Sequence, residues 1–315
     1  CLKIINKDGE LVPFTPNLGQ LELDKALEEQ RAQGKPPRAL VLKARQVGFS
    51  TYAQGKLIHK ATLKANQNAL VVAHDIKTGN RLYRMGETMY ANLPEDPAIK
   101  PPVRHHNRGR FLHFAPPGKE AWAKGDQWPN STYLVDTAKE FESGRGGTYQ
   151  LVHLSEFAFW DRPLEKLTAL RQGIPRNPDT LLIIESTANG MNLFRDLWVD
   201  AEEGRSGFIP FFWPWYREPG YTLPFANESE KKRFIKHEFG IGPWGKEEEE
   251  LLELGCTYEQ LHWRRHTIAD ECAGKLEKFH QEYPSTAEQA FVTTGQQVFD
   301  TQVVRGIIKT CDITD

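Results

Sequence analysis

The stretch VLKARQVGFST, at residues 41–51, contains residue types that bind phosphate, but not in their usual order. In the common phosphate-binding loop, G-x-x-x-x-G-K-[ST], a lysine directly follows the second glycine. Here Gly48 is in place, but Phe49 follows it and Lys43 stands where the first glycine belongs. Ser50 falls at the position of the hydroxyl that coordinates Mg²⁺. The chemistry that this pattern suggests is the binding of nucleotide phosphates.

The cation that holds the phosphates must then come from the start of the loop. A lysine there can fold across the loop and bring its ammonium group to the β- and γ-phosphates, and Lys43 is placed for that role. Arg45 offers a second contact, from a guanidinium group, to phosphate oxygens. Two plainer interpretations remain open: an ordinary strand–turn–helix corner, and a strand-end lysine that points to solvent.

Hydrolysis of ATP also needs a group that organises the metal and a base that polarises water, on a strand adjacent to the loop strand. The run LVHLSEF, residues 151–157, has that form, with Ser155 where an acid is more usual. We expect Ser155 to support Mg²⁺ through its hydroxyl or a bound water. Glu156 stands at the carboxyl end of the strand, where ligands bind in open α/β sheets, and is expected to orient the attacking water. A surface glutamate is the plainer alternative, and His153 is expected to be a satisfied core histidine.

Two loops flank this run. ESGRGG, residues 142–147, presents Arg145 between glycines. Its guanidinium is suited to neutralise transition-state charge, in cis or across a subunit boundary, although a simple turn is an open alternative. ESTANG, residues 185–190, ends the next apolar run with small polar residues that can sense the γ-phosphate and pass its loss to a neighbouring element. These residues are Ser186, Thr187 and Asn189.

Five short apolar runs predict buried parallel strands. They lie at residues 39–44, 69–75, 132–138, 149–156 and 180–187. Helical patterns follow at residues 51–64 and 77–93. Strands that alternate with helices predict an α/β fold with a mostly parallel, doubly wound sheet.

After residues 208–216 the character of the chain changes, because proline and glycine cluster and capped helices follow. Asn227 is expected to cap a helix that Gly240 ends, and TYEQ at residues 257–260 is a capping box. The acidic run at residues 246–254 is expected to be a solvated helix face. These features predict a small helical subdomain.

Composition sets further limits. The 315 residues carry a formal net charge of -2, so a nucleic-acid surface has to be local. Four scattered cysteines without a C-x-x-C pair argue against zinc and against a disulfide scaffold. No apolar run approaches the roughly 20 residues that span a bilayer. The chain opens on Cys1, and we expect it to be a fragment of a longer protein.

With these pieces in this order, the chain resembles the ATPase domain of the large terminase of tailed bacteriophages, the motor that pumps DNA into preformed capsids. In one branch of that family the lysine stands at the start of the nucleotide loop, as Lys43 does in KARQVGFS. The resemblance covers roughly residues 14 to 300. Four further motifs match: GRGGT (144–148), VHLSE (152–156), STANG (186–190) and EYPSTAEQAFVTTGQQVFD (282–300). The last is similar to the segment that joins the ATPase to its nuclease.

The resemblance implies a P-loop NTPase fold with an additional strand and a catalytic glutamate, together with a small helical lid. It divides the chain into an ATPase core at residues 1–213, a lid at 214–282 and a linker at 283–315. The linker leads towards a C-terminal nuclease domain that is absent from this chain. Nuclease activity is not expected, because Asp300, Asp312 and Asp315 alone cannot build a two-metal site.

The resemblance also implies ATP and Mg²⁺ as cofactors and a role for each motif residue. The implied catalytic residues are Glu156, Arg145 and Lys43, with Arg145 inserted into the site of a neighbouring subunit. The implied nucleotide contacts are Lys43, Arg45, Gln46, Val47, Gly48, Phe49, Ser50, Thr51 and Gln20. Gln20 would read adenine, although an ordinary loop glutamine is an alternative. Ser50 and Ser155 would hold Mg²⁺, the latter directly or through water. Ser186, Thr187 and Asn189 would couple hydrolysis to movement.

The implied partners are double-stranded DNA, the portal protein of the procapsid, the small terminase subunit and further copies in a ring. The implied location is the host cytoplasm, with no part in a membrane. DNA-contacting residues cannot be named from the sequence. The basic stretch at residues 104–110 is suited to touch DNA phosphates without base readout, or is a solvated loop.

Two departures from the usual pattern, Phe49 and Ser155, weaken the phosphate and metal shell. Two alternatives therefore stay open beside the packaging ATPase. One is a helicase-like DNA-dependent ATPase. The other is a degenerate nucleotide-binding or DNA-binding module that does not hydrolyse ATP.

Overall fold

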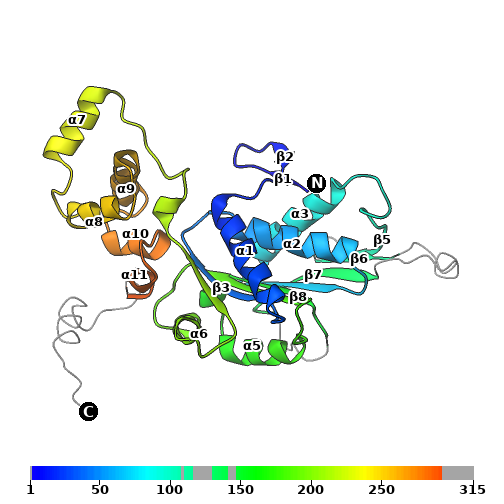
Figure 1. Ribbon diagram of the computed structural model, residues 1–315. Coiled ribbons are helices and arrows are strands. Elements are labelled where there is room, and N and C mark those ends of the chain that lie inside the picture. Colours follow the sequence, from blue (N-terminus) through cyan, green and yellow to red (C-terminus); the bar gives the residue numbers. More distant parts are fainter. Residues whose placement is uncertain (1, 108–109, 116–129, 141–146, 293–315) are drawn as a thin grey trace, which may run out of the picture. The chain divides into compact units, whose positions relative to one another are not determined.

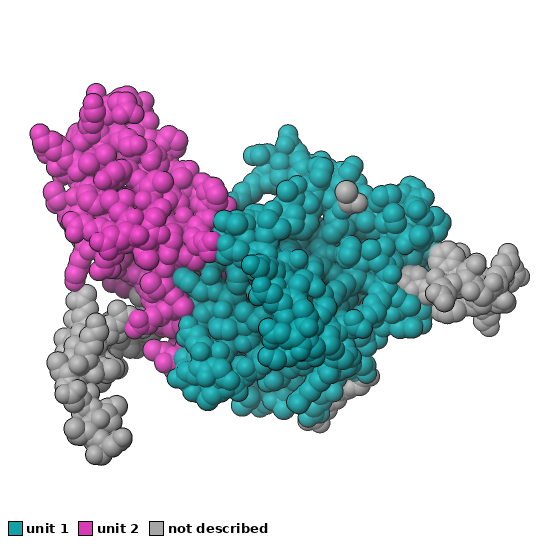
Figure 2. Space-filling model, in the orientation of Figure 1, with its two compact units in different colours: residues 1–42, 46–186, 196–213 teal, residues 43–45, 187–195, 214–315 magenta. Residues whose placement is uncertain are grey.

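The computed structural model describes residues 2–107, 110–115, 130–140 and 147–292 (Figure 1). The chain divides into two compact units, which Figure 2 colours separately. Unit 1 comprises residues 1–42, 46–186 and 196–213. Unit 2 comprises residues 43–45, 187–195 and 214–315. Unit 2 therefore takes in two short segments that follow strands of the core, as well as the later part of the chain.

An eight-stranded sheet forms the centre of unit 1, with the strand order β10-β3-β9-β8-β4-β7-β6-β5. The strands that pair in parallel are β3 (Arg38–Lys43), β4 (Asn68–Ala73), β7 (Ser131–Thr137), β8 (Leu151–Ser155) and β9 (Leu181–Ser186). β6 (Phe111–Phe114) pairs antiparallel with β7 and with β5 (Val103–Asn107). β10 (Ile209–Trp213) lies beside β3 at the other edge, and β1 (Lys3–Ile5) and β2 (Leu11–Pro13) form a separate antiparallel pair. The predicted strands and the mostly parallel α/β sheet are confirmed, with small shifts at the strand ends.

Helices lie on both sides of this sheet. In Figure 1, α1 (Leu18–Ala32), α2 (Phe49–Leu63) and α3 (Ile76–Ala91) lie above it and α5 (Pro163–Gln172) lies below it. α6 (Leu193–Glu202) follows β9 in the chain. Every residue of β3, β8 and β9 is buried, as expected for parallel strands covered on both faces. Because these parallel strands are covered along their length, polar side chains from several strands can meet where the strands end, at their carboxyl ends.

The strand beside the loop strand β3 is β9, which lies between β3 and β8. The expectation that LVHLSEF, here β8, is adjacent to the loop strand is therefore wrong. β9 is inserted as the additional strand, and its register places Glu185 opposite Ser155. The residues that can reach the loop most directly are consequently those of β9.

Unit 2 is helical in its described part. It contains α7 (Glu228–His237), α8 (Glu248–Glu253), α9 (Tyr258–Asp270), α10 (Leu276–Glu282), α11 (Ala287–Val292) and the short 3₁₀ turns η2 (Trp215–Arg217) and η3 (Gly245–Glu247). Asn227 caps α7 and Thr257 forms the capping box of α9, as predicted. α7 ends at His237, before Gly240, because the backbone N–H groups of Glu238 and Phe239 both turn back to the Phe234 carbonyl. Across the described residues, no helix has both the length and the apolar character that crossing a bilayer requires.

The acidic run of unit 2 is not simply a solvated helix face, and that expectation is wrong for two of its residues. Glu248 is fully buried, and both of its carboxylate oxygens accept hydrogen bonds from Arg265, at 2.6 and 2.9 Å. Glu247 lies 2.9 Å from His280 Nε2 and 3.0 Å from Arg264 Nη2. Burial by itself raises the pKa of Glu247, but the hydrogen bond from His280 and the charge of Arg264 outweigh it, so the pKa is lowered. These ion pairs, with Glu248 fully and Glu247 partly buried, tie η3 and α8 to α9 and α10.

Candidate active site

The loop between β3 and α2 has the shape of an anion site. Gln46 and Gly48 both take left-handed backbone conformations, with φ of 52° and 84°. The positive φ of Gly48 favours glycine, and a Cβ atom there would also displace the end of the Gln20 side chain, whose Nε2 would lie 2.7 Å away. α2 begins at Phe49, so the N–H groups of its first turn and the positive end of its dipole follow the loop directly.

The start of α1 holds this loop in place. The side chain of Gln20 donates from Nε2 to the Gly48 carbonyl at 2.8 Å, and Asn17 donates from Nδ2 to the Val47 carbonyl at 3.1 Å. The Gln20 oxygen accepts from the backbone N–H of Asn17, which completes a capping box at the start of α1. Gln20 thus braces the loop backbone in this structure, and its role as a reader of adenine stays a prediction.

Phe49 occupies the usual lysine position, and its side chain belongs to the core. It is 1% exposed and packs edge-on against Phe211 and Trp213, with ring centroids 5.6 and 6.3 Å away. A charged ammonium at this position would be buried among aromatic rings, at a high desolvation cost. The backbone N–H is consequently the part of Phe49 that suits a phosphate.

Lys43 and Arg45 belong to unit 2. Lys43 is the last residue of β3 and only 5% exposed, so a strand-end lysine pointing to solvent is excluded. Arg45 is held by α10, since its N–H donates to the Glu282 carbonyl at 3.1 Å and its Nε lies 3.5 Å from the Glu282 carboxylate. The hydroxyl of Tyr221 donates to the Arg45 carbonyl. A phosphate contact from Arg45 would compete with Glu282.

A buried polar cluster joins the start of α2 to the ends of β8 and β9. The Ser50 hydroxyl donates to Glu185 Oε1, the Ser155 hydroxyl lies 3.3 Å from the same oxygen, and His153 Nε2 lies 3.0 Å from it. His153, Ser155 and Glu185 are each at most 1% exposed. The structure thus brings together Ser50 and Ser155, the two residues predicted to hold Mg²⁺, around a carboxylate.

Glu185 was missed by reasoning from the sequence, although a signal was present. It is the single charged residue in the buried run LLIIES, one position before the strand ends. A carboxylate inside a fully buried strand is costly unless hydrogen bonds compensate it, so such a residue marks a polar site.

Glu156 follows β8 and adopts a left-handed conformation with φ of 53°. For a residue with a side chain this conformation costs about 1 kcal/mol or more, and it is concentrated at functional sites. One carboxylate oxygen lies 3.5 Å from the hydroxyl of Ser186, which also accepts from the Ala158 N–H at 3.2 Å. The contact brings together the predicted water-orienting residue and one predicted coupling residue.

The remaining predicted residues are distributed differently. Arg145 lies outside the residues that the structure describes, as do Asp300, Asp312 and Asp315. Thr187 and Asn189 belong to the 187–195 segment of unit 2. Thr51 is partly buried in the first turn of α2.

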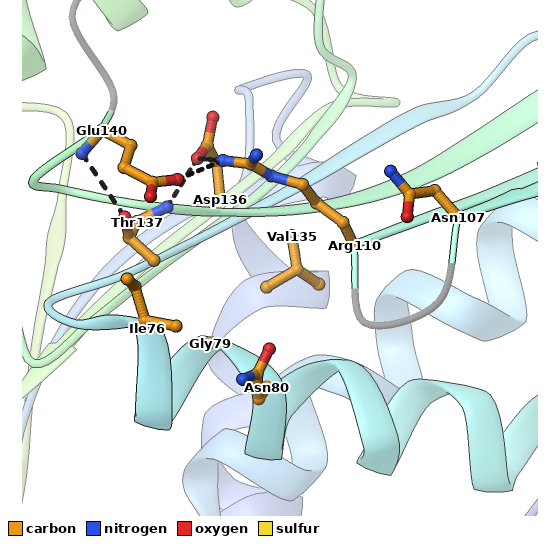
Figure 3. A pocket seen from close by; sticks show the side chains of 9 residues that line it. All are labelled: Ile76, Gly79, Asn80, Asn107, Arg110, Val135, Asp136, Thr137 and Glu140. Carbon is orange, nitrogen blue, oxygen red and sulfur yellow. Dashed lines mark hydrogen bonds and ion pairs between the residues drawn. The ribbon is translucent and has the colours of Figure 1, made fainter.

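Arg110, the last residue of the basic stretch, lines a separate pocket at the end of β7 (Figure 3). Its guanidinium bonds to Asp136 at 2.8 Å and to Glu140 at 2.5 Å. The hydrogen bond to Asp136 is the main reason why the pKa of Arg110 is raised. Because two carboxylates neutralise this arginine, it is a poor candidate for a DNA phosphate contact, and for the rest of residues 104–110 that role stays a prediction.

No family model matches the sequence. The ATPase domain of the large terminase of Thermus phage P74-26, in a mutant form, aligns with a TM-score of 0.53 at 16% identity, over 89% of this chain and 95% of that chain. A second structure of that ATPase domain aligns with a TM-score of 0.50 at 18% identity, over 86% and 93%. The large terminase of bacteriophage HK97 aligns with a TM-score of 0.53 at 14% identity, over 86% of this chain and 50% of that chain. This chain therefore has the fold of the ATPase domains of phage large terminases, a P-loop NTPase fold.

Proposed function

We propose that this chain is the ATPase part of a large terminase, a motor subunit that hydrolyses ATP to move double-stranded DNA into a procapsid. The observation that carries the proposal is the pair of contacts made by two successive residues of β9, Glu185 and Ser186. Glu185 bonds to Ser50 at the start of the loop helix, and Ser186 contacts the carboxylate of Glu156. These contacts support the proposal, because hydrolysis requires a phosphate-binding loop and a carboxylate that orients water close together.

In this proposal the loop binds the triphosphate. Backbone N–H groups of Gln46, Val47, Gly48 and Phe49 and the start of α2 meet the phosphate oxygens, with Thr51 beside them. The ammonium of Lys43 supplies the positive charge that the usual loop lysine provides, and Arg45 assists when Glu282 releases it. Gln20 is proposed to contact the adenine while it braces the loop.

Mg²⁺ fits the oxygen atoms of Ser50, Ser155 and Glu185 in the buried cluster, which are of the kind this ion prefers. Ser50 would hold it, and Ser155 would support it directly or through water. When bound, the ion neutralises charge on the β- and γ-phosphates.

Glu156 performs the chemical step on the water. Its carboxylate accepts a hydrogen bond from the water, aligns the water oxygen with the γ-phosphorus and takes the proton as the bond to phosphorus forms. The bond between the γ-phosphorus and the bridging oxygen breaks, and ADP leaves. The left-handed backbone of Glu156 and the hydroxyl of Ser186 hold the carboxylate ready for this role.

The remaining roles follow the same proposal. Arg145 neutralises transition-state charge in the site of a neighbouring subunit of a ring. Ser186, Thr187 and Asn189 pass the loss of the γ-phosphate to unit 2, whose residues 214–282 act as the lid and whose residues 283–315 act as the linker to a nuclease. The portal protein and the small terminase subunit are the proposed partners, and the host cytoplasm is the proposed location.

The experiment that tests this function is steady-state ATP hydrolysis by the assembled protein, with and without double-stranded DNA. We expect turnover to fall at least about 100-fold in E156Q and in K43A, on the scale of losing a transition-state contact. E156Q should still bind ATP, because its change affects the water and not the phosphates. The matched controls are E165Q and K25A, whose side chains are exposed, and both should retain normal turnover.

Near-normal turnover in E156Q or in K43A would refute the role of that residue. Absence of hydrolysis by the native assembly, with nucleotide binding intact, would instead favour the non-hydrolysing module. Hydrolysis that DNA stimulates without any packaging of DNA into procapsids would favour the helicase-like ATPase.

A further inference from the structure

The acid that usually ends the strand bearing the catalytic glutamate is missing from β8, where Ser155 stands. On the neighbouring strand, Glu185 is fully buried and directly opposite Ser155 in the parallel register. Since β9 lies between β8 and the loop strand β3, a carboxylate on β9 is one strand closer to the loop than residue 155 is. The chain therefore has an acid near the expected place, on a different strand.

The contacts of Glu185 are those expected of an acid that organises a metal shell. Ser50, the residue at the Mg²⁺ position of the loop, donates its hydroxyl hydrogen to Glu185 Oε1. Ser155 lies 3.3 Å from the same atom. A fully buried carboxylate pays a large desolvation cost, which hydrogen bonds and a nearby cation offset.

Two further side chains fix the position of Glu185. The amide nitrogen of Gln54 lies 2.8 Å from His153 Nδ1, and an amide nitrogen can only donate, so Nδ1 accepts. Nε2 of the neutral ring then carries the hydrogen and donates to Glu185 at 3.0 Å. Gln54 stands one helical turn after Ser50 on α2, and its oxygen accepts from the Tyr133 hydroxyl at 2.7 Å. A continuous chain of hydrogen bonds therefore runs from Tyr133 to Ser50.

From this geometry we propose that Glu185 supplies from β9 the carboxylate that β8 lacks, orienting Ser50 and completing the oxygen shell for the Mg²⁺ of a bound nucleotide. His153 and Gln54 are positioning residues that act through Glu185. This inference rests on the proposed nucleotide site, and it explains how the site works although Ser155 replaces an acid.

The test measures binding of a fluorescent ATP analogue to the assembled protein, in MgCl₂ and in EDTA. In the native protein, Mg²⁺ should strengthen binding. In E185Q that gain should shrink about 10-fold or more, the usual scale for loss of a group that orients metal ligands, while affinity in EDTA stays unchanged. The double variant S155D/E185Q, which moves the acid to β8, should recover most of the gain. E165Q, on the exposed surface of α5, is the control and should bind as the native protein does.

Thermal unfolding followed by circular dichroism shows whether each variant is folded. A folded E185Q with the native response to Mg²⁺ would overturn the inference, and so would a folded S155D/E185Q that gains nothing over E185Q. If E185Q does not fold, S155D/E185S carries the test, and a folded double variant without a response to Mg²⁺ contradicts the proposal. If the native protein binds no nucleotide in either condition, the proposed function itself fails.

Discussion

Phe49 is the residue at which the proposed phosphate loop departs most clearly from the common motif. The ring packs edge-on against Phe211 and Trp213, so it anchors the start of α2. Lys43, buried at the end of β3, remains as the candidate for the displaced charge. Because the core holds an aromatic ring at residue 49, the lysine has to stand elsewhere in the loop. A lysine placed at residue 49 should therefore not bind the phosphates as the lysine of the common motif does.

Substitution of Phe49 tests this link. We expect F49K to lower the free energy of unfolding by about 3 kcal/mol or more, because it removes a buried aromatic ring and buries a charge. F49L, which keeps the site apolar, should cost clearly less. Urea unfolding followed by tryptophan fluorescence measures both changes.

The double variant K43A/F49K separates function from stability. If Lys43 holds the phosphates, the ATPase activity of K43A/F49K should be as low as that of K43A. Recovery of activity together with native stability would show that residue 49 faces the nucleotide after all.

At the scale of elements, the sequence predicted the strands well because each is a short, continuous apolar run between polar turns. It predicted the caps of α7 and α9 because Asn227 and Thr257 act on backbone groups only three residues away. It did not predict the order of the strands, since the insertion of β9 between β3 and β8 depends on pairings between segments far apart in the chain.

That error in strand order explains most of what was missed at the site. With β8 expected next to the loop strand, the predicted Mg²⁺ residues are Ser50 and Ser155, and Glu185 has no role. The paired acids of unit 2 were missed for a related reason, since a run of glutamates gives no sign that Arg264 and Arg265 pair with two of them. The strand order and these ion pairs depend on contacts between residues far apart in the sequence, which local sequence patterns do not reveal.

At the scale of the whole molecule, the proposed motor requires several copies that complete one another's sites. Arg145→Ala alone should retain nucleotide binding and lose turnover, because the missing guanidinium acts on transition-state charge. Mixed assemblies of R145A and E156Q subunits should regain part of the ATPase activity, since one site can combine a native Glu156 with a native Arg145. Mixed rings, verified by mass, that show no activity above that of either variant would contradict action across a subunit boundary.

The central claim is that the loop of residues 43–50 binds ATP with a lysine from its start. A crystal structure of the chain with a non-hydrolysable ATP analogue and Mg²⁺ tests it most directly. We expect the Lys43 ammonium to lie within hydrogen-bond distance of the β- or γ-phosphate oxygens. Phe49 should stay in the core, and the ion should lie beside Ser50 and Glu185. A nucleotide bound away from this loop, or triphosphate oxygens that Lys43 does not contact, would contradict it.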